Sequence, residues 1–161
     1  DAIHRAETAQ TSYFSRCPYV RFLMPPKKWN LFISHAWSYS ERYEGVVRLL
    51  DNGDGFPWKN YSVPEHDPVL DPETESGRNK LIAELREQIR LTHCVIVIAG
   101  MYVNNSYWIQ KEIDIANEWD KSIIAIRRRG QQRTPQSLVD LADRTVNWNT
   151  SSLITAIREV S

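Results

Sequence analysis

The sequence feature that most limits the possible folds is a run of consecutive apolar residues, Val95-Ile96-Val97-Ile98-Ala99-Gly100. A strand that alternates apolar and polar residues has one face in water, whereas a strand without alternation is buried on both faces. Leu31-Phe32-Ile33-Ser34 and Ile123-Ile124-Ala125-Ile126 have the same character, and Thr145-Val146-Asn147-Trp148 is a shorter candidate. A weak further strand is predicted at Tyr61-Ser62-Val63. These runs predict a parallel sheet that is covered on both faces.

Helices are predicted between these strands by apolar residues spaced three and four apart. The two clearest sets are Tyr43, Val46, Val47 and Leu50, for which Ser38 or Ser40 can be the N-cap, and Leu81, Ile82, Leu85 and Ile89. Further helices are predicted near Trp108, over Ser151–Val160, and as one short helix between Gly130 and Asp143. The alternation predicts an α/β fold: a flavodoxin-like open parallel five-stranded sheet, order 2-1-3-4-5, with helices on both faces.

The chain divides into two parts of different character. Residues 1–28 are predicted to be an N-terminal extension and linker, with a short helix near Ala2–Gln10 and a Pro25-Pro26-Lys27-Lys28 ending. Residues 29–161 have the size and the apolar content of one domain. Within that domain, Phe56–Asp71 is aromatic, contains prolines and is predicted to be a long loop.

Charge and cysteine content restrict the partners and the compartment. Lys plus Arg and Asp plus Glu are both 20, so the chain lacks the basic field that binding to nucleic acid or to an anionic membrane requires. Cys94 lies in an apolar strand and is expected to be a buried free thiol, which favours a reducing, cytoplasmic location. No apolar run reaches the length of a membrane span, and no signal-peptide pattern is present.

Several common functions of α/β proteins lack their motifs here. The sequence contains neither the Gly-x-Gly-x-x-Gly of dinucleotide-binding dehydrogenases nor a P-loop. Its four histidines are scattered and no Cys-x-x-Cys is present, so no metal site is predicted. A phospho-receiver needs acidic residues after the first strand and an aspartate after the third, where this chain has Ser34-His35 and Ala99-Gly100. Ser34 and His35 are adjacent and lack a nucleophile elbow, which gives a hydrolase little support.

One carboxylate breaks the pattern of the helix near Trp108. At about 100° per residue, one arc of roughly half the helix carries Trp108, Ile109, Ile113, Ile115, Ala116 and Trp119. Glu112 lies in the middle of that arc. Two interpretations fit equally well: Glu112 binds a sugar hydroxyl and stabilises an oxocarbenium ion, or it pairs with an Arg or with backbone groups inside the fold.

Topology predicts where a ligand binds. In open parallel sheets the site lies beyond the carboxyl ends of the strands, at the point where the winding reverses, here between the first and third strands. The candidate substrate-binding residues in the two loops there are Ser34, His35, Trp37, Ser106 and Trp108. Each has a structural alternative. The tryptophans stack on a ring of the ligand or anchor the core. His35 contacts a ribose or phosphate of the ligand, or instead bonds a loop carbonyl. Ser106 lies beside a phosphate of the ligand, or instead caps the helix.

Four segments together resemble the TIR-like domain family of the Thoeris antiphage defence system, of the ThsB type. They are Leu31–Trp37, the loop Phe56–Pro64, Ile98–Tyr102 and Trp108–Ala116, and the similarity covers residues 29–161. In TIR enzymes a helix begins with a Trp and carries the catalytic Glu four residues later. Trp108 and Glu112 match that spacing, so the resemblance implies that Glu112 is the catalytic residue.

The resemblance also implies the reaction and the partners. It implies a NAD glycohydrolase or ADP-ribosyl cyclase that cleaves the nicotinamide-ribose bond, with Glu112 holding the ribose hydroxyls and the loop from Ser34 to Trp37 lining the pocket. NAD is then a substrate, and no cofactor is expected. Self-association is expected, as is a downstream effector that reads a cyclic nucleotide product. Many TIR domains are not enzymes, so the alternative is a non-catalytic self-association or signalling scaffold.

Overall fold

The computed structural model describes residues 27–34, 41–63, 72–102, 106–127 and 134–161. Its centre is a sheet of five parallel strands in the order β2-β1-β3-β4-β5. The strands are β1 (Trp29–Ile33), β2 (Trp58–Asn60), β3 (Cys94–Ile98), β4 (Ser122–Arg127) and β5 (Arg144–Asn147). The predicted flavodoxin-like α/β fold is therefore confirmed.

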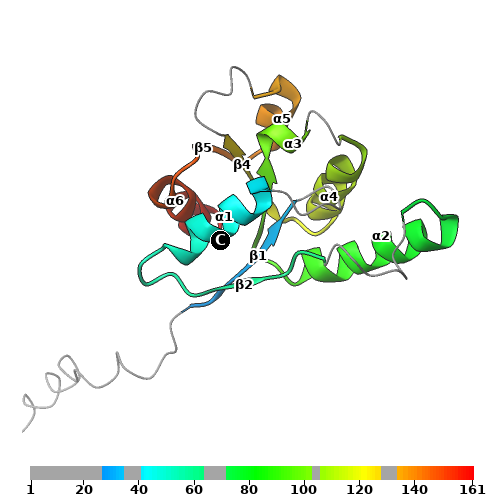
Figure 1. Cartoon of the computed structure of the whole chain (residues 1–161), viewed down its shortest axis with the longest axis horizontal. Coiled ribbons are helices and arrows are strands. Elements are labelled where there is room, and N and C mark those ends of the chain that lie inside the picture. Colours follow the sequence, from blue (N-terminus) through cyan, green and yellow to red (C-terminus); the bar gives the residue numbers. More distant parts are fainter. Residues whose placement is uncertain (1–26, 35–40, 64–71, 103–105, 128–133) are drawn as a thin grey trace, which may run out of the picture.

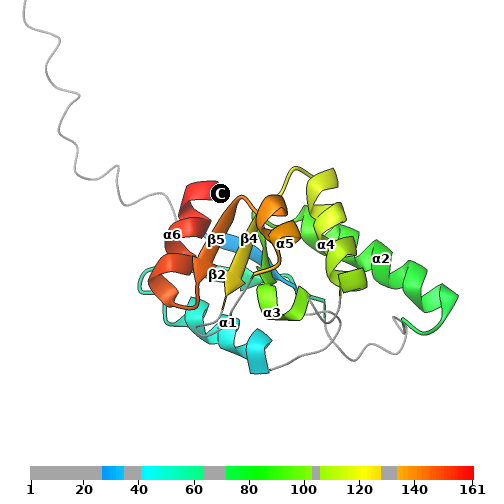
Figure 2. The same ribbon diagram turned by 90° about the horizontal axis from the view of Figure 1, so that it is seen from above.

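Helices cover both faces of this sheet (Figures 1 and 2). They are α1 (Glu41–Asp51), α2 (Glu75–Arg90), α3 (Ala99–Tyr102), α4 (Ser106–Glu118), α5 (Gln136–Leu141) and α6 (Thr150–Val160). Helices α1 and α6 pack together on one face, and α2 and α4 pack together on the other. Each predicted helix within the described residues is present.

The core lies on the three central strands. Every residue of β3 is buried, as are Leu31–Ile33 in β1 and Ile123–Ile126 in β4. Burial on both faces explains why these strands lack polar alternation. Cys94 is buried and free, as expected, and burial raises the pKa of its thiol to about 12, so the thiol stays protonated.

The end of the third strand along the chain differs from the prediction. The run Val95–Gly100 does not stay in the sheet to its end, because β3 ends at Ile98 and Ala99–Tyr102 form the single turn of α3. The ladder between β3 and β4 ends at the pair Ile98 and Ile126. Apolar character persists through the turn because Ala99 and Met101 are also buried, so composition alone does not mark the end of the strand.

The edge strand β2 lies at Trp58–Asn60 rather than at Tyr61–Val63. The reason is that the Ser62 side chain, rather than a strand backbone, makes the hydrogen bonds to the end of β1. The Oγ of Ser62 accepts a hydrogen bond from the Ile33 amide at 2.9 Å and donates one to the Ile33 carbonyl at 3.1 Å. The Ser62 amide in turn donates to Oδ1 of Asn60. The ladder therefore ends in a turn stabilised by side chains.

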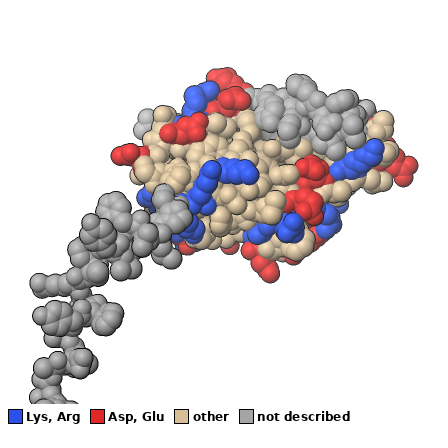
Figure 3. Space-filling model, turned by 90° about the horizontal axis from the view of Figure 1, so that it is seen from below, with Lys and Arg blue, Asp and Glu red and all other residues tan. Residues whose placement is uncertain are grey.

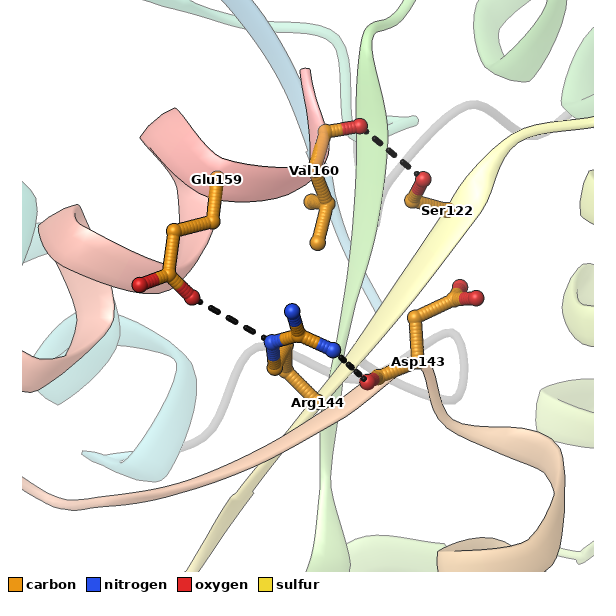
Figure 4. Close-up of polar contacts among 5 residues, drawn as sticks. All are labelled: Ser122, Asp143, Arg144, Glu159 and Val160. Atoms are coloured by element: carbon orange, nitrogen blue, oxygen red, sulfur yellow. Dashed lines mark hydrogen bonds and ion pairs between the residues drawn. The ribbon is translucent and has the colours of Figure 1, made fainter.

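The C-terminal helix is fixed at both ends. At its start, Oδ1 of Asn149 accepts a hydrogen bond from the Ser152 amide at 2.8 Å, which is an N-cap. At its end, Ser122 donates to the Val160 carbonyl and Arg144 donates to Glu159 (Figure 4). These bonds attach α6 to β4 and β5.

Some predictions fall outside the described residues: the helix near Ala2–Gln10 and the caps Ser38 and Ser40. The first strand begins at Trp29, and the division into an extension and a domain stays a prediction. Among the helices of the described ranges, none has the length and apolar character needed to cross a membrane. Lys and Arg side chains are interspersed with Asp and Glu side chains on the face in Figure 3.

Candidate active site

The end of β1 forms one side of the candidate site. Ser34 directly follows the strand, and its amide still donates a hydrogen bond to the Ile96 carbonyl of β3 at 2.8 Å. The sheet order reverses between β1 and β3, so Ser34 lies at the predicted switch point. Its side chain is fully buried. The hydroxyl therefore starts from a backbone position that the sheet itself fixes.

Helix α4 forms the other side. Its predicted apolar arc is largely confirmed, because Ile109, Ile113, Ile115 and Ala116 are buried and attach the helix to the core. Glu112 lies among them with only 2% of its surface exposed. Helix α4 therefore carries a carboxyl group into the apolar interior.

The prediction for Trp119 is wrong. This side chain is 44% exposed because α4 ends at Glu118, and the chain then turns through Asp120, whose φ is 49°. The helical arc no longer applies after that turn.

The two sides meet through one hydrogen bond. The hydroxyl of Ser34 donates to Oε2 of Glu112, across 78 positions of sequence. Among the described residues, Glu112 takes part in no ion pair. The structural alternative, in which Glu112 pairs with an Arg or with backbone groups, is therefore not observed within the described part of the chain.

Burial dominates the acidity of this carboxyl group. Removal from water disfavours the charged form and raises the pKa of Glu112 from 4.5 to about 8, while the hydrogen bond from Ser34 favours the carboxylate and lowers the pKa. The group is thus poised to gain or lose a proton close to neutral pH. Carboxyl groups perturbed in this way are concentrated at functional sites.

The single turn of helix α3 lies between α1 and α4 (Figure 2). Nη1 of Arg42, in the first turn of α1, donates to the Gly100 carbonyl at 3.0 Å. The hydroxyl of Tyr102 donates to Oε1 of Gln110 on α4 at 3.1 Å. Sequence reasoning missed Arg42, since a single Arg in the first turn of an amphipathic helix looks like any solvated residue. Its position brings a positive charge to the carboxyl edge of the sheet.

The other predicted site residues are only partly described. Trp108 is half-buried against the core, with its ring edge-on to Tyr107 at 5.2 Å between centroids. Ser106 begins α4, but its side chain lies outside the described atoms, and His35 and Trp37 lie outside the described residues. No group of three or more potential metal ligands occurs in the ranges that the structure covers. The substrate-binding roles of these residues remain predictions.

A buried carboxyl group beside a hydroxyl can bind and polarise a sugar. A carboxylate accepts hydrogen bonds from a vicinal diol, and in a site shielded from water its charge strongly stabilises a developing oxocarbenium ion. Only the ionised form does both. The geometry therefore suits cleavage of a bond at an anomeric carbon.

Comparison with known proteins identifies the family. The model of the family described as Thoeris protein ThsB, TIR-like domain, matches residues 32–133. The search of curated proteins gives no match. The solved structure of the Clostridium botulinum CMP N-glycosidase BcmB is similar, with a TM-score of 0.48 and 14% identity over 80% of this chain and 98% of that chain. That likeness says nothing about shared chemistry. Because the family match spans more than half of the chain and includes both Ser34 and Glu112, the protein belongs to the ThsB TIR-like domain family.

Proposed function

We propose that the protein is a NAD glycohydrolase or ADP-ribosyl cyclase that acts in antiphage defence. The observation that carries the proposal is the position of Glu112, which is buried at the switch point and bonded to a neutral hydroxyl. Membership of the ThsB family and the spacing of Trp108 and Glu112 support the same chemistry. NAD is the proposed substrate, and no cofactor is needed.

The proposed reaction requires one carboxylate. In NAD the nicotinamide is joined to the ribose through a positively charged ring nitrogen, so the bonding electron pair returns to the ring and nicotinamide leaves neutral. No general acid is then required for departure. Ionised Glu112 accepts hydrogen bonds from the ribose hydroxyls and stabilises the cationic ribose.

The acceptor determines the product. Attack by water at the anomeric carbon gives ADP-ribose and releases one proton. Attack by a nucleophilic atom of the bound adenine or ribose gives a cyclic isomer, again with loss of one proton if that atom carried one. We propose that the cyclic product is the signal, read by a separate effector. We also propose that His35, Trp37, Ser106 and Trp108 line the pocket, with Ser34 behind Glu112.

Incubation of the full chain with NAD, followed by mass spectrometry, tests the proposal. We expect nicotinamide to appear together with ADP-ribose or with a cyclic ADP-ribose whose mass is lower by one water. Because the proposed role is in antiphage defence, the incubation is repeated with lysate from phage-infected cells, against the same lysate without the protein. Intact NAD under both conditions would contradict the enzyme proposal and favour the scaffold alternative.

A further inference from the structure

Ser34 is held in place by hydrogen bonds from its backbone and from its side chain. Its amide donates to the Ile96 carbonyl, and its hydroxyl donates to Oε2 of Glu112. The side chain has no exposed surface. A hydroxyl whose proton is already given to a carboxylate has no proton left to donate to a ligand. This arrangement suits a residue that acts through Glu112.

The second oxygen of Glu112 differs from the first. Among the described residues, Oε1 makes no hydrogen bond, whereas Oε2 is held by Ser34. A Glu side chain has three rotatable torsions, so a helix alone does not fix where its carboxyl group points. One hydrogen bond to a rigid strand end restricts that freedom and leaves the other oxygen without a hydrogen-bond partner among the described residues.

We propose that Ser34 is a positioning residue, whose hydroxyl holds Oε2 of Glu112 in place so that Oε1 receives the ligand. The contribution to turnover rests on the proposed function above. The effect on the carboxyl group itself does not rest on it, because the hydrogen bond joins two groups of the protein. Loss of the Ser34 hydroxyl then affects both the orientation and the charge state of Glu112.

Other charges close to the site are kept constant by the test. The titratable and charged side chains described on the surrounding elements include Arg42 on α1, Arg86 on α2, Cys94 on β3, Tyr102 on α3, Tyr107, Lys111, Asp114 and Glu118 on α4, and Arg127 on β4. Arg86 and Glu118 form an exposed pair with each other. A substitution at Ser34 changes none of these groups.

The matched control is Ser62. Its hydroxyl lies at the same end of β1, but its hydrogen bonds are with the backbone of Ile33 rather than with Glu112. Ser62→Ala therefore removes the same chemical group beside the same strand. Ser34→Cys is a second site variant, because a thiol is a weaker donor of nearly the same shape.

The first readout is the protonation of Glu112, followed by infrared spectroscopy across pH. The carbonyl band of the protonated carboxyl group is assigned by its loss in Glu112→Gln. We expect Ser34→Ala to raise the midpoint pH of this band by about one unit. A hydrogen bond to a charged group stabilises the charged form by at least the energy that corresponds to one pKa unit. Ser34→Cys is expected to fall between, and Ser62→Ala to match the wild type.

The second readout is turnover of NAD near neutral pH. We expect Ser34→Ala to lower kcat about tenfold while KM changes less than about threefold, which is the pattern of a group that acts through the reacting residue. An unchanged infrared midpoint in folded Ser34→Ala would overturn the proposal, as would a raised KM with unchanged kcat. If Ser34→Ala does not fold, a wild-type midpoint in Ser34→Cys overturns it instead. If the wild type does not cleave NAD, the proposed function fails, but the infrared titration still decides the role of Ser34.

Discussion

Glu112 links the stability of the protein to pH. Its pKa is about 8 in the folded protein and close to 4.5 when exposed, so between these values the folded state binds more protons than the unfolded state. Stability must then fall as pH rises from 4.5 to 8 and level off above. The loss of unfolding free energy is on the order of 5 kcal/mol.

Glu112→Gln removes this loss because the amide stays neutral. We expect the variant to unfold at higher urea concentration than the wild type at pH 8.5, with a difference that shrinks towards pH 5. Urea unfolding followed by circular dichroism at both values measures it. Equal pH dependence in the two proteins would show that Glu112 is not buried with a raised pKa.

The same pKa predicts how activity depends on pH. If the ionised carboxylate stabilises the cationic ribose, kcat/KM for nicotinamide release rises with pH through a midpoint near 8 and levels off about one pH unit higher. The midpoint of the kcat/KM profile reports the pKa of Glu112 in the free enzyme. Initial rates between pH 6 and 10, corrected for spontaneous decay of NAD, measure this profile. A profile that falls over this interval would mean that the protonated carboxyl group is the active form.

Residues with a distinctive pattern were predictable, and their partners were not. Glu112 interrupts an apolar arc, so its burial could be predicted from helical spacing. Its hydrogen bond with Ser34 depends on how α4 lies against the end of β1, which no local pattern encodes. Arg42 gave no signal at all, since its contact is with a backbone carbonyl of another element.

At the level of elements, the cap of α6 makes a separate prediction about stability. The side chain of Asn149 satisfies the Ser152 amide, which has no partner within the helix. We expect Asn149→Ala to cost about 1 kcal/mol of unfolding free energy and Asn149→Asp to cost much less, because Asp keeps the acceptor oxygen. Urea unfolding gives both values. Equal losses in the two variants would mean that the cap contributes through something other than its acceptor.

A strand could be predicted from sequence when all of its residues are buried, and less well when some are buried and others exposed. The central strands are buried on both faces, so β1, β3 and β4 follow from runs of apolar residues. The edge strand β2 has half-buried and exposed residues and is three residues long, so its position depends on the Ser62 hydrogen bonds rather than on composition. The single turn of α3 is too short to show helical spacing.

For the whole molecule, assembly and catalysis need to be separated. The net charge is zero, so little electrostatic repulsion opposes association of copies. Because Glu112 is buried, we expect Glu112→Gln to leave the dependence of molar mass on protein concentration unchanged in light scattering. A change in assembly would mean that lost activity in this variant reflects lost association, and the catalytic assignment would not stand.

The most direct test compares nicotinamide release by the wild type, Glu112→Gln and Glu118→Gln. Glu118 is the matched control because it lies on the same helix but is exposed and paired with Arg86. With folding verified for each protein, we predict that Glu112→Gln lowers the rate about a hundredfold or more and that Glu118→Gln stays within about twofold of the wild type. Comparable rates for Glu112→Gln and the wild type would contradict the assignment of Glu112 as the residue that stabilises the reacting ribose.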